Sequence, residues 1–273
     1  MSGTVTRLAP RRPALLGEDD PAPFEIVNGE GRARAVLFCD HASRAVPRAL
    51  GDLGLDESLL ERHIGWDIGA GDVTRRLAAM IDAPAVLAGF SRLVIDCNRP
   101  PDSPASIPRV SDGVAIAGNA GVDEAAAQAR AEACFWPYHN ALDATITRGG
   151  ERFDGPPMVI SMHSFTPVMD GFERPWQVSV LWDRDAATAR ALIDALAADP
   201  AIRVGDNEPY SGRVPVPNSI PVHAVARRLP HVTIEIRQDL IDTHHGAEAW
   251  ANIIAAALHR VLADASLYRP IEG

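Results

Sequence analysis

Two histidines stand where an apolar run gives way to small and turn-forming residues. His41 follows the run VLFCD at 36–40, and His163 follows the run MVISM at 158–162. Short apolar runs are typical of strands buried on both faces, and α/β proteins place their chemistry where such strands end. One such histidine alone is more often a solvated strand-end residue. Two histidines in matching positions favour a shared catalytic or metal-binding site.

Asp67 adds a carboxylate to this pair of histidines. It lies between Trp66 and Ile68 in the segment RHIGWDIGAGD, 62–72, which otherwise suits a buried helix. A carboxylate buried there needs a cation or hydrogen-bond donors. A helix N-cap or a salt-bridged aspartate is the structural alternative. His63, four residues earlier, can share a helix face with Asp67 and is a reserve ligand.

A further candidate, Glu235, lies inside the predicted strand HVTIEIRQD. Because side chains alternate along a strand, Glu235 shares a face with Thr233 and Arg237, and three aliphatic residues occupy the other face. An ion pair between Glu235 and Arg237 is the structural alternative. The company of two histidines and an aspartate favours a catalytic interpretation. Zinc hydrolases use three histidine or carboxylate ligands, leave one position for water, and place a carboxylate nearby to take its proton.

Arginines recur in two further segments, together with amide and hydroxyl side chains. The segment SRLVIDCNRP contains Arg92, Asn98 and Arg99, and the segment NEPYSGR contains Ser211 and Arg213. The planar fork of an arginine suits a carboxylate. Surface ion pairs explain each arginine of the first segment singly, and turn formation explains the second segment.

The elements that must position these residues follow from hydrophobic periodicity. Strands separated by helices favour a mainly parallel or mixed central sheet covered on both faces, a three-layer α/β/α arrangement. The segment 98–121 is rich in Pro, Gly and Ser, and a loop of that length is usually functional or mobile. The pattern predicts strands at 34–39, 85–88, 92–96, 157–162, 176–182 and 231–236, and helices at 56–81, 122–148, 185–198, 219–228 and 246–264.

Length and composition bound the class of protein. The chain has 273 residues, of which 47% are hydrophobic, and this suits one large α/β domain. Residues 1–24 carry Pro and charges without sustained periodicity and are expected to form an irregular arm, with a single hydrolytic domain at 25–273. The net charge is −10 and the basic residues form no long run, so nucleic acid is not an expected partner.

The cysteines and the hydropathy pattern indicate the compartment. Three cysteines, an odd number without a CxxC pair, favour reduced thiols over a disulfide framework. No stretch approaches about 18 uninterrupted apolar residues, and the N-terminus lacks the apolar core of a signal peptide. We therefore expect a soluble, cytoplasmic protein without a membrane partner, which acts on a small molecule.

Seven motifs together resemble the N-formylglutamate amidohydrolase family, in the same order along about residues 34–262. SRLVIDCNRP, HSF and EIRQD are specific as a set. The resemblance implies a zinc-dependent hydrolase that cleaves the amide of an N-acyl acidic amino acid, with a fold like that of the zinc exopeptidases, namely carboxypeptidases and aspartoacylases. The motifs are DHAS followed by Pro at 40–47, WDIGA at 66–70, SRLVIDCNRP at 91–100, WPYH at 136–139, MHSF at 162–165, NEPYSG at 207–212 and IEIRQD at 234–239.

Residue by residue, the resemblance implies a zinc ion held by His41, Asp67 and His163, with Glu235 as the general base and acid. His163 matches the histidine of the family's HS motif, and Glu235 matches its strand glutamate. The family usually has PHSG at the first histidine, so Asp40 replaces Pro here, and Asp67 stands where a histidine is common. These departures leave other N-formyl or N-acyl compounds open as substrates.

The remaining polar residues are assigned to the substrate. Arg99 is expected either to stabilise the carbonyl oxygen as it gains charge or to grip a substrate carboxylate. Arg92, Arg213 and Arg237 are the other carboxylate clamps, with Asn98 and Ser211 as further substrate contacts.

Two other functions stay open. A metallocarboxypeptidase acting on a peptide or peptidoglycan fragment would use the same metal centre, with the 98–121 loop forming or blocking an extended cleft. A non-catalytic small-molecule binding module would be free of metal. If the zinc ligands are assigned wrongly, His63 and His139 are the next candidates.

Overall fold

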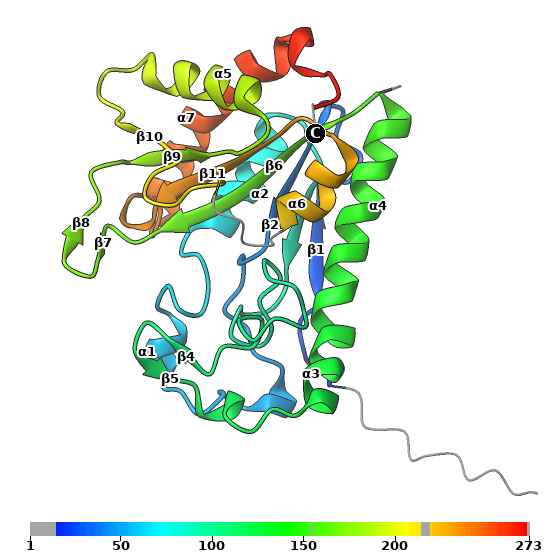
Figure 1. Ribbon diagram of the computed structural model, residues 1–273, viewed down its shortest axis with the longest axis vertical. Coiled ribbons are helices and arrows are strands. Elements are labelled where there is room, and N and C mark those ends of the chain that lie inside the picture. The colour runs from blue at the N-terminus through cyan, green and yellow to red at the C-terminus, as the bar shows by residue number, and fades with distance from the viewer. Residues whose placement is uncertain (1–14, 154, 214–218, 272–273) are drawn as a thin grey trace, which may run out of the picture.

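The structure is a computed structural model that describes residues 15–153, 155–213 and 219–271. Within these residues, seven strands form one mixed sheet in the order β1-β3-β2-β6-β11-β9-β10 (Figure 1). The strands from β3 to β11 run parallel, as do β9 and β10, whereas the pairs β1-β3 and β11-β9 are antiparallel. Their bounds are Phe24–Val27 (β1), Ala85–Ala88 (β3), Ala35–Cys39 (β2), Met158–Phe165 (β6), His231–Arg237 (β11), Val178–Leu181 (β9) and Val204–Asp206 (β10).

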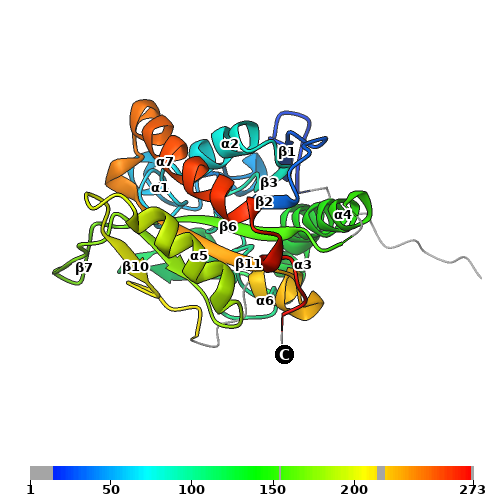
Figure 2. The same ribbon diagram turned by 90° about the horizontal axis from the view of Figure 1, so that it is seen from above.

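Side chains of the central strands point alternately to the two faces of the sheet, and they form one apolar cluster on each face. On β2, Leu37 packs into the cluster under α2, α5 and α7, and its neighbour Phe38 packs into the cluster under α4. Figure 2 shows these helices in two layers with the sheet between them, which confirms the predicted three-layer α/β/α fold. The four helices are Ala70–Met80 (α2), Ala186–Ala197 (α5), His244–Ala263 (α7) and Trp136–Arg152 (α4).

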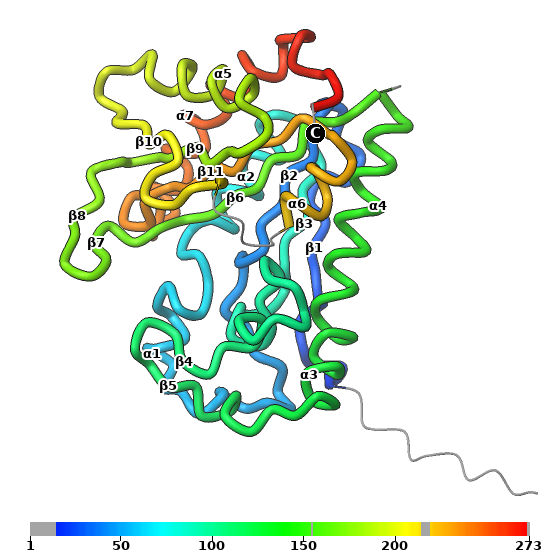
Figure 3. The backbone as a smooth tube through the Cα atoms, viewed as in Figure 1, coloured from blue at the N-terminus to red at the C-terminus, as the bar shows by residue number. Residues whose placement is uncertain are grey.

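α4 covers only one half of its face of the sheet. It packs mainly against β1, β2 and β3, whereas the five-residue helix α6 (Ser219–His223) packs against β11 (Figure 3). The consequence is visible along β6. Val159 packs into the cluster under α4, but Ser161 and His163, further along the same face, line an open cleft.

The predicted helix at 56–81 is wrong as one element. The chain forms α1 (Glu57–Leu60) and α2, with turns between them. Gly69 ends these turns with a positive φ of 77°, and a Cβ there would lie 2.1 Å from the carbonyl oxygen of Ile241. The break places Asp67 in a turn before α2 instead of in a helix.

The predicted strand at 92–96 is also wrong. Residues 93–96 are buried and Arg92 is half-buried, but the segment forms turns, because Ser91 satisfies the local backbone in place of a sheet partner. Its Oγ donates to the carbonyl of Gly65 at 2.6 Å and accepts from the backbone N–H of Leu93 at 3.1 Å. The turns place Arg92 at the cleft.

The remaining elements are short or continue a helix already described. The predicted helix at 122–148 consists of α3, a π-helical stretch and α4, and the 98–121 loop contains a small hairpin, β4-β5. The strands β1 and β10 were not among the predicted elements. None of the described helices is long and apolar enough to cross a membrane. The additional bounds are Glu124–Arg130 (α3), Ala131–Phe135 (the π-helical stretch), Val110–Ser111 (β4), Val114–Ala115 (β5), Val168–Met169 (β7) and Phe172–Glu173 (β8).

Candidate active site

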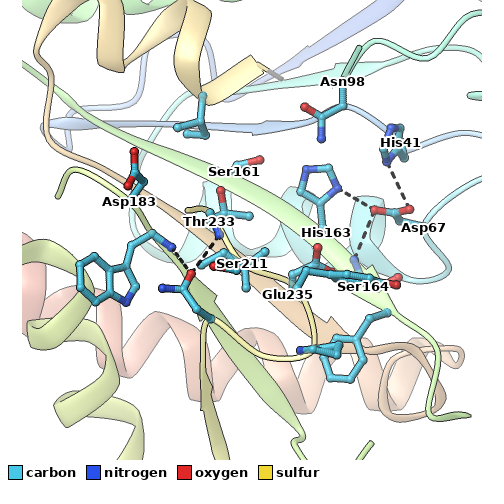
Figure 4. A pocket seen from close by; sticks show the side chains of 18 of the residues that line it. His41, Asp67, Asn98, Ser161, His163, Ser164, Asp183, Ser211, Thr233 and Glu235 are labelled. Carbon is cyan, nitrogen blue, oxygen red and sulfur yellow. Dashed lines mark hydrogen bonds and ion pairs between the residues drawn. The ribbon is translucent and has the colours of Figure 1, made fainter. Parts of the chain in front are cut away.

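Two parallel neighbouring strands and one turn bring His41, Asp67 and His163 together. His41 follows the last residue of β2, His163 lies near the end of β6, and the backbone N–H of Asp67 donates to the carbonyl of His41 at 3.0 Å. The Nδ1 atom of His163 lies 2.7 Å from Asp67 Oδ2, and that of His41 lies 3.3 Å from Asp67 Oδ1 (Figure 4). All three side chains are buried, and they form a group that can hold a metal ion, with one ligand atom from each within 4.8 Å of the others.

The outer nitrogen of each ring faces a second carboxylate. His41 Nε2 lies 2.8 Å from Asp96 Oδ1, and His163 Nε2 lies 3.5 Å from Asp40 Oδ2. Metal-binding histidines commonly use their second nitrogen in this way, which fixes the ring and its tautomer. His41 Nδ1 has no hydrogen-bond partner among the described residues although it is buried. The donor set, the inward Nδ1 atoms and this unpartnered nitrogen fit a divalent cation.

Carboxylates alternate with histidine and arginine side chains in the site. Burial alone would raise the pKa values of Asp67 and Asp96. His41 and His163 nevertheless hold the pKa of Asp67 well below its usual range. Arg92 and His41 do the same for the pKa of Asp96. Burial would lower the pKa of each histidine, yet the carboxylates beside each ring raise it. The carboxylates are therefore charged and attract positive charge, which protons supply when no metal ion is bound.

Glu235 lies beside this group on β11. It is paired in register with His163 on β6, is only 7% exposed, and its Oε2 has no hydrogen-bond partner among the described residues. Burial raises its pKa to about 7, against the opposing effect of His163. A carboxyl group with that pKa and an unpartnered oxygen suits proton transfer near neutral pH.

A cleft of about 1100 Å³ connects Glu235 with the cation-binding group. Its floor is the part of the sheet that α4 leaves uncovered, and its walls come from the turns at 98–99, the loop at 207–213 and α6. The reserve ligand His63 lines the cleft, but His139 lies behind it, with Nε2 2.9 Å from the carbonyl of Cys97. The predicted site residues that line the cleft are His41, Asp67, Arg92, Asn98, Arg99, His163, Ser211, Arg213 and Glu235.

Arg237 is placed differently from the other predicted site residues. It is not among those that line the cleft, and its guanidinium donates to both carboxylate oxygens of Asp239, at 2.8 and 3.2 Å, and to the carbonyl of Arg174 at 3.2 Å. Arg237 is therefore engaged with Asp239, and not with Glu235 or with the cleft.

The other arginines differ in how far they are already engaged. Arg92 donates to Asp96 at 2.9 Å and to Asp67 at 3.4 Å, so its guanidinium is already paired with two carboxylates of the site. Arg99 donates to the carbonyl of Asn98 at 2.7 Å, and Arg213 lies over the Trp182 ring, 4.2 Å from its centroid. Among the described residues, neither Arg99 nor Arg213 has a carboxylate partner, which leaves both able to bind one from a ligand.

Several functional side chains were missed by sequence reasoning. Asp40 and Asp96 both lie in the motifs quoted above. Asp40 could have been found because it is next to His41, and Asp96 because it is a charged residue among apolar ones. Tyr138 and Ser219 both donate to Asp40, at 2.9 and 2.7 Å. Ser219 carries no local sequence signal, because only the tertiary fold brings it to Asp40.

Comparisons with known proteins bear on the family and the fold of the chain. A family model described as N-formylglutamate amidohydrolase matches residues 33–242. The chain is similar to gene product Atu2144 from Agrobacterium tumefaciens, with 33% identity, a TM-score of 0.87, and coverage of 92% of this chain and 99% of that one. N-formylglutamate amidohydrolase from Ralstonia eutropha JMP134 shares the fold, with 20% identity, a TM-score of 0.64, and coverage of 88% and 97%. The search of curated proteins finds no match.

Proposed function

Because the chain belongs to the N-formylglutamate amidohydrolase family and is a hydrolase of that type, we propose that it cleaves the amide of an N-formyl or N-acyl amino acid with the help of zinc. His41, Asp67 and His163 hold the metal ion in this proposal. Zinc, when bound, makes hydroxide available near neutral pH and polarises a carbonyl group. The observation that carries the proposal is Glu235, a buried carboxyl with an unpartnered oxygen, next to a three-ligand group in one cleft.

Glu235 handles the proton in both halves of the reaction. It accepts a proton from the attacking water as the new C–O bond forms at the formyl carbon. It then delivers that proton to the amide nitrogen as the C–N bond breaks, which releases formate and the free amino acid. Its pKa of about 7 suits both roles, because the carboxylate form accepts the proton and the acid form can return it.

Arg99 orients the substrate. It lines the cleft and has no carboxylate partner among the described residues, so its fork is available for two parallel hydrogen bonds to a substrate carboxylate. Arg213 is the second clamp, backed by the Trp182 ring. Asn98 and Ser211 line the same walls and offer an amide and a hydroxyl group for the rest of the substrate.

The test compares substrates on the same zinc-loaded preparation. N-formylglutamate should be hydrolysed, and its analogue with both carboxylates amidated should not. Equal turnover of the neutral analogue would contradict the clamp and indicate a more general deformylase or peptidase.

A metallocarboxypeptidase is the second candidate, and the size of the cleft favours it. The volume of about 1100 Å³ is slightly above that of typical ligand pockets, which measure about 300–1000 Å³. Assays with a dipeptide, a peptidoglycan fragment and N-formylglutamate would distinguish the two proposed activities. Elemental analysis of the purified protein separates both from a metal-free binding module.

A further inference from the structure

Asp40 is a buried carboxylate outside the three candidate ligands. It is 1% exposed, and two hydroxyl groups and the His163 ring lie against it. The proposed hydrolysis gives this buried carboxylate no direct part.

Three side chains surround the carboxylate of Asp40. Oδ1 accepts hydrogen bonds from Tyr138 Oη at 2.9 Å and from Ser219 Oγ at 2.7 Å. Oδ2 has no hydrogen-bond partner among the described residues, and His163 Nε2 lies 3.5 Å from it. A buried carboxylate is costly unless donors compensate it. These contacts fix the carboxylate on one side and direct its remaining oxygen at His163.

Ser219 connects the same carboxylate to the wall of the cleft. It is the first residue of α6, and its backbone N–H donates to Asn98 Oδ1 at 2.9 Å. The next two residues, Ile220 and Pro221, line the cleft. Asp40 is therefore the point at which a candidate metal ligand, the turn that carries Asn98, and α6 are joined by polar contacts.

We propose that Asp40 is a positioning residue that holds the His163 ring with Nδ1 toward the cation, and that Tyr138 and Ser219 hold Asp40 in turn. This inference rests on the proposed function only for the identity of the cation. It predicts that cation affinity depends on two hydroxyl groups that touch neither the cation nor any of its ligands.

The first measurement is zinc affinity by competition with a chelator. Asp40→Asn should weaken zinc binding by about tenfold to a hundredfold, the usual cost of removing a group that orients a metal ligand. Tyr138→Phe and Ser219→Ala should each weaken it by a smaller factor, because each leaves the carboxylate but removes one of its donors. Adding either change to Asp40→Asn should cost little more, since contacting residues are not additive.

Two matched variants control for the loss of a hydroxyl group. Tyr268→Phe removes a hydroxyl that donates to the carbonyl of Leu262, and Thr145→Val removes a buried one that donates to the carbonyl of Ala141. Both should leave zinc affinity within about twofold of the wild type. If they weaken it as much as Tyr138→Phe and Ser219→Ala, general destabilisation explains the effect and the inference is overturned.

The second measurement needs no metal. In NMR spectra of the metal-free protein, the Nε2–H proton of His163 should be observable, because the nitrogen is buried and faces the Asp40 carboxylate, which slows its exchange with water. Asp40→Asn should remove or strongly shift this resonance, and the two control variants should not. If Asp40→Asn does not fold, Tyr138→Phe and Ser219→Ala decide, since both keep the carboxylate.

The outcomes separate this inference from the proposed function. Failure of the wild type to bind zinc, with the His163 resonance still dependent on Asp40, contradicts the zinc enzyme but supports the positioning role. Wild-type zinc affinity in Asp40→Asn, with an unchanged His163 resonance, overturns the positioning role and leaves the zinc enzyme standing.

Discussion

Glu235 and His163 lie opposite each other on neighbouring parallel strands, in register at their Cα atoms. This pairing sets the carboxyl of Glu235 beside one ring of the cation-binding group without a flexible segment between them. Sites built on paired strands hold their geometry better than sites built on loops.

The candidate ligands should control metal content. His41→Ala and His163→Ala should each lose most of the zinc bound by the wild type, because each removes one of three ligands. Elemental analysis of dialysed protein measures this, with His259→Ala, an exposed histidine on α7, as the control. Stoichiometric zinc in both ligand variants would show the assignment to be wrong and make His63 the next residue to change.

Glu235→Gln should keep the fold and the metal but lose turnover. The amide has the same shape but cannot accept a proton from water, and removing a general base costs about a hundredfold to ten-thousandfold in rate. Steady-state kinetics and zinc content should be measured on one preparation. Near-normal activity would remove Glu235 from the mechanism, and unfolding would show a mainly structural role.

Arg99→Lys should cost nearly as much in kcat/KM as Arg99→Ala. Lysine keeps the charge but lacks the fork that gives two parallel hydrogen bonds. A loss of about 2 kcal/mol, roughly thirtyfold in kcat/KM, is expected for both variants with unchanged zinc content. Arg237→Lys is the matched control, because Arg237 bonds to Asp239 away from the cleft. Full activity of Arg99→Lys would indicate that charge alone suffices.

Gly69→Ala should destabilise the protein and weaken metal binding. A methyl group there would meet the carbonyl oxygen of Ile241 at 2.1 Å, and the strain would move the turn that carries Asp67. Gly113→Ala is matched, since Gly113 also has a positive φ, 73°, but no atom within 4 Å of the new methyl group. In urea denaturation, Gly69→Ala should lose at least about 2 kcal/mol more than Gly113→Ala. Equal losses would mean that the turn relaxes without strain.

The buried pair His139 and His223 should make stability depend on pH. Burial, with a contribution from His139 at 2.7 Å, lowers the pKa of His223 to about 4 in the folded protein, below the ordinary value of 6.5. Between these values the unfolded chain binds more protons than the folded one, so the free energy of unfolding should fall as pH falls from about 6.5 to 4. We expect a loss of about 3 kcal/mol from this group.

Urea denaturation of chelator-treated protein at several pH values measures this dependence without a contribution from bound metal. His223→Gln should show a flatter dependence over the same window, because the titrating group is gone. An identical slope in the variant and the wild type would assign the acid sensitivity to other groups.

The residues that could be predicted from sequence are those whose signal is local. Apolar runs before His41 and His163 located two strands, although β6 continues to Phe165, past the predicted end at 162. Alternation on β11 gave the face on which Glu235 lies. Parallel pairing of β2, β6 and β11 then follows from the alternating pattern, and it brings these three residues together.

Other parts depend on contacts between distant segments. The run at 92–96 is as apolar as a strand, but Ser91 bonds it to the turn at 65, and sequence periodicity does not reveal such a bond. Arg237 belongs to the cleft face by alternation, yet Asp239, two residues later, captures it. The role of Ser219 depends on a contact with Asp40, 179 positions away.

The partial coverage of the sheet by α4 bears on how this enzyme can diversify. The candidate metal ligands and Glu235 belong to strands and a turn packed under long helices, whereas the cleft walls come from loops and a five-residue helix. Loops tolerate insertion, deletion and replacement far better than packed elements do. Changes of substrate among relatives should therefore accumulate as length variation at 98–121 and 207–213, while the strands that carry the chemistry keep their length.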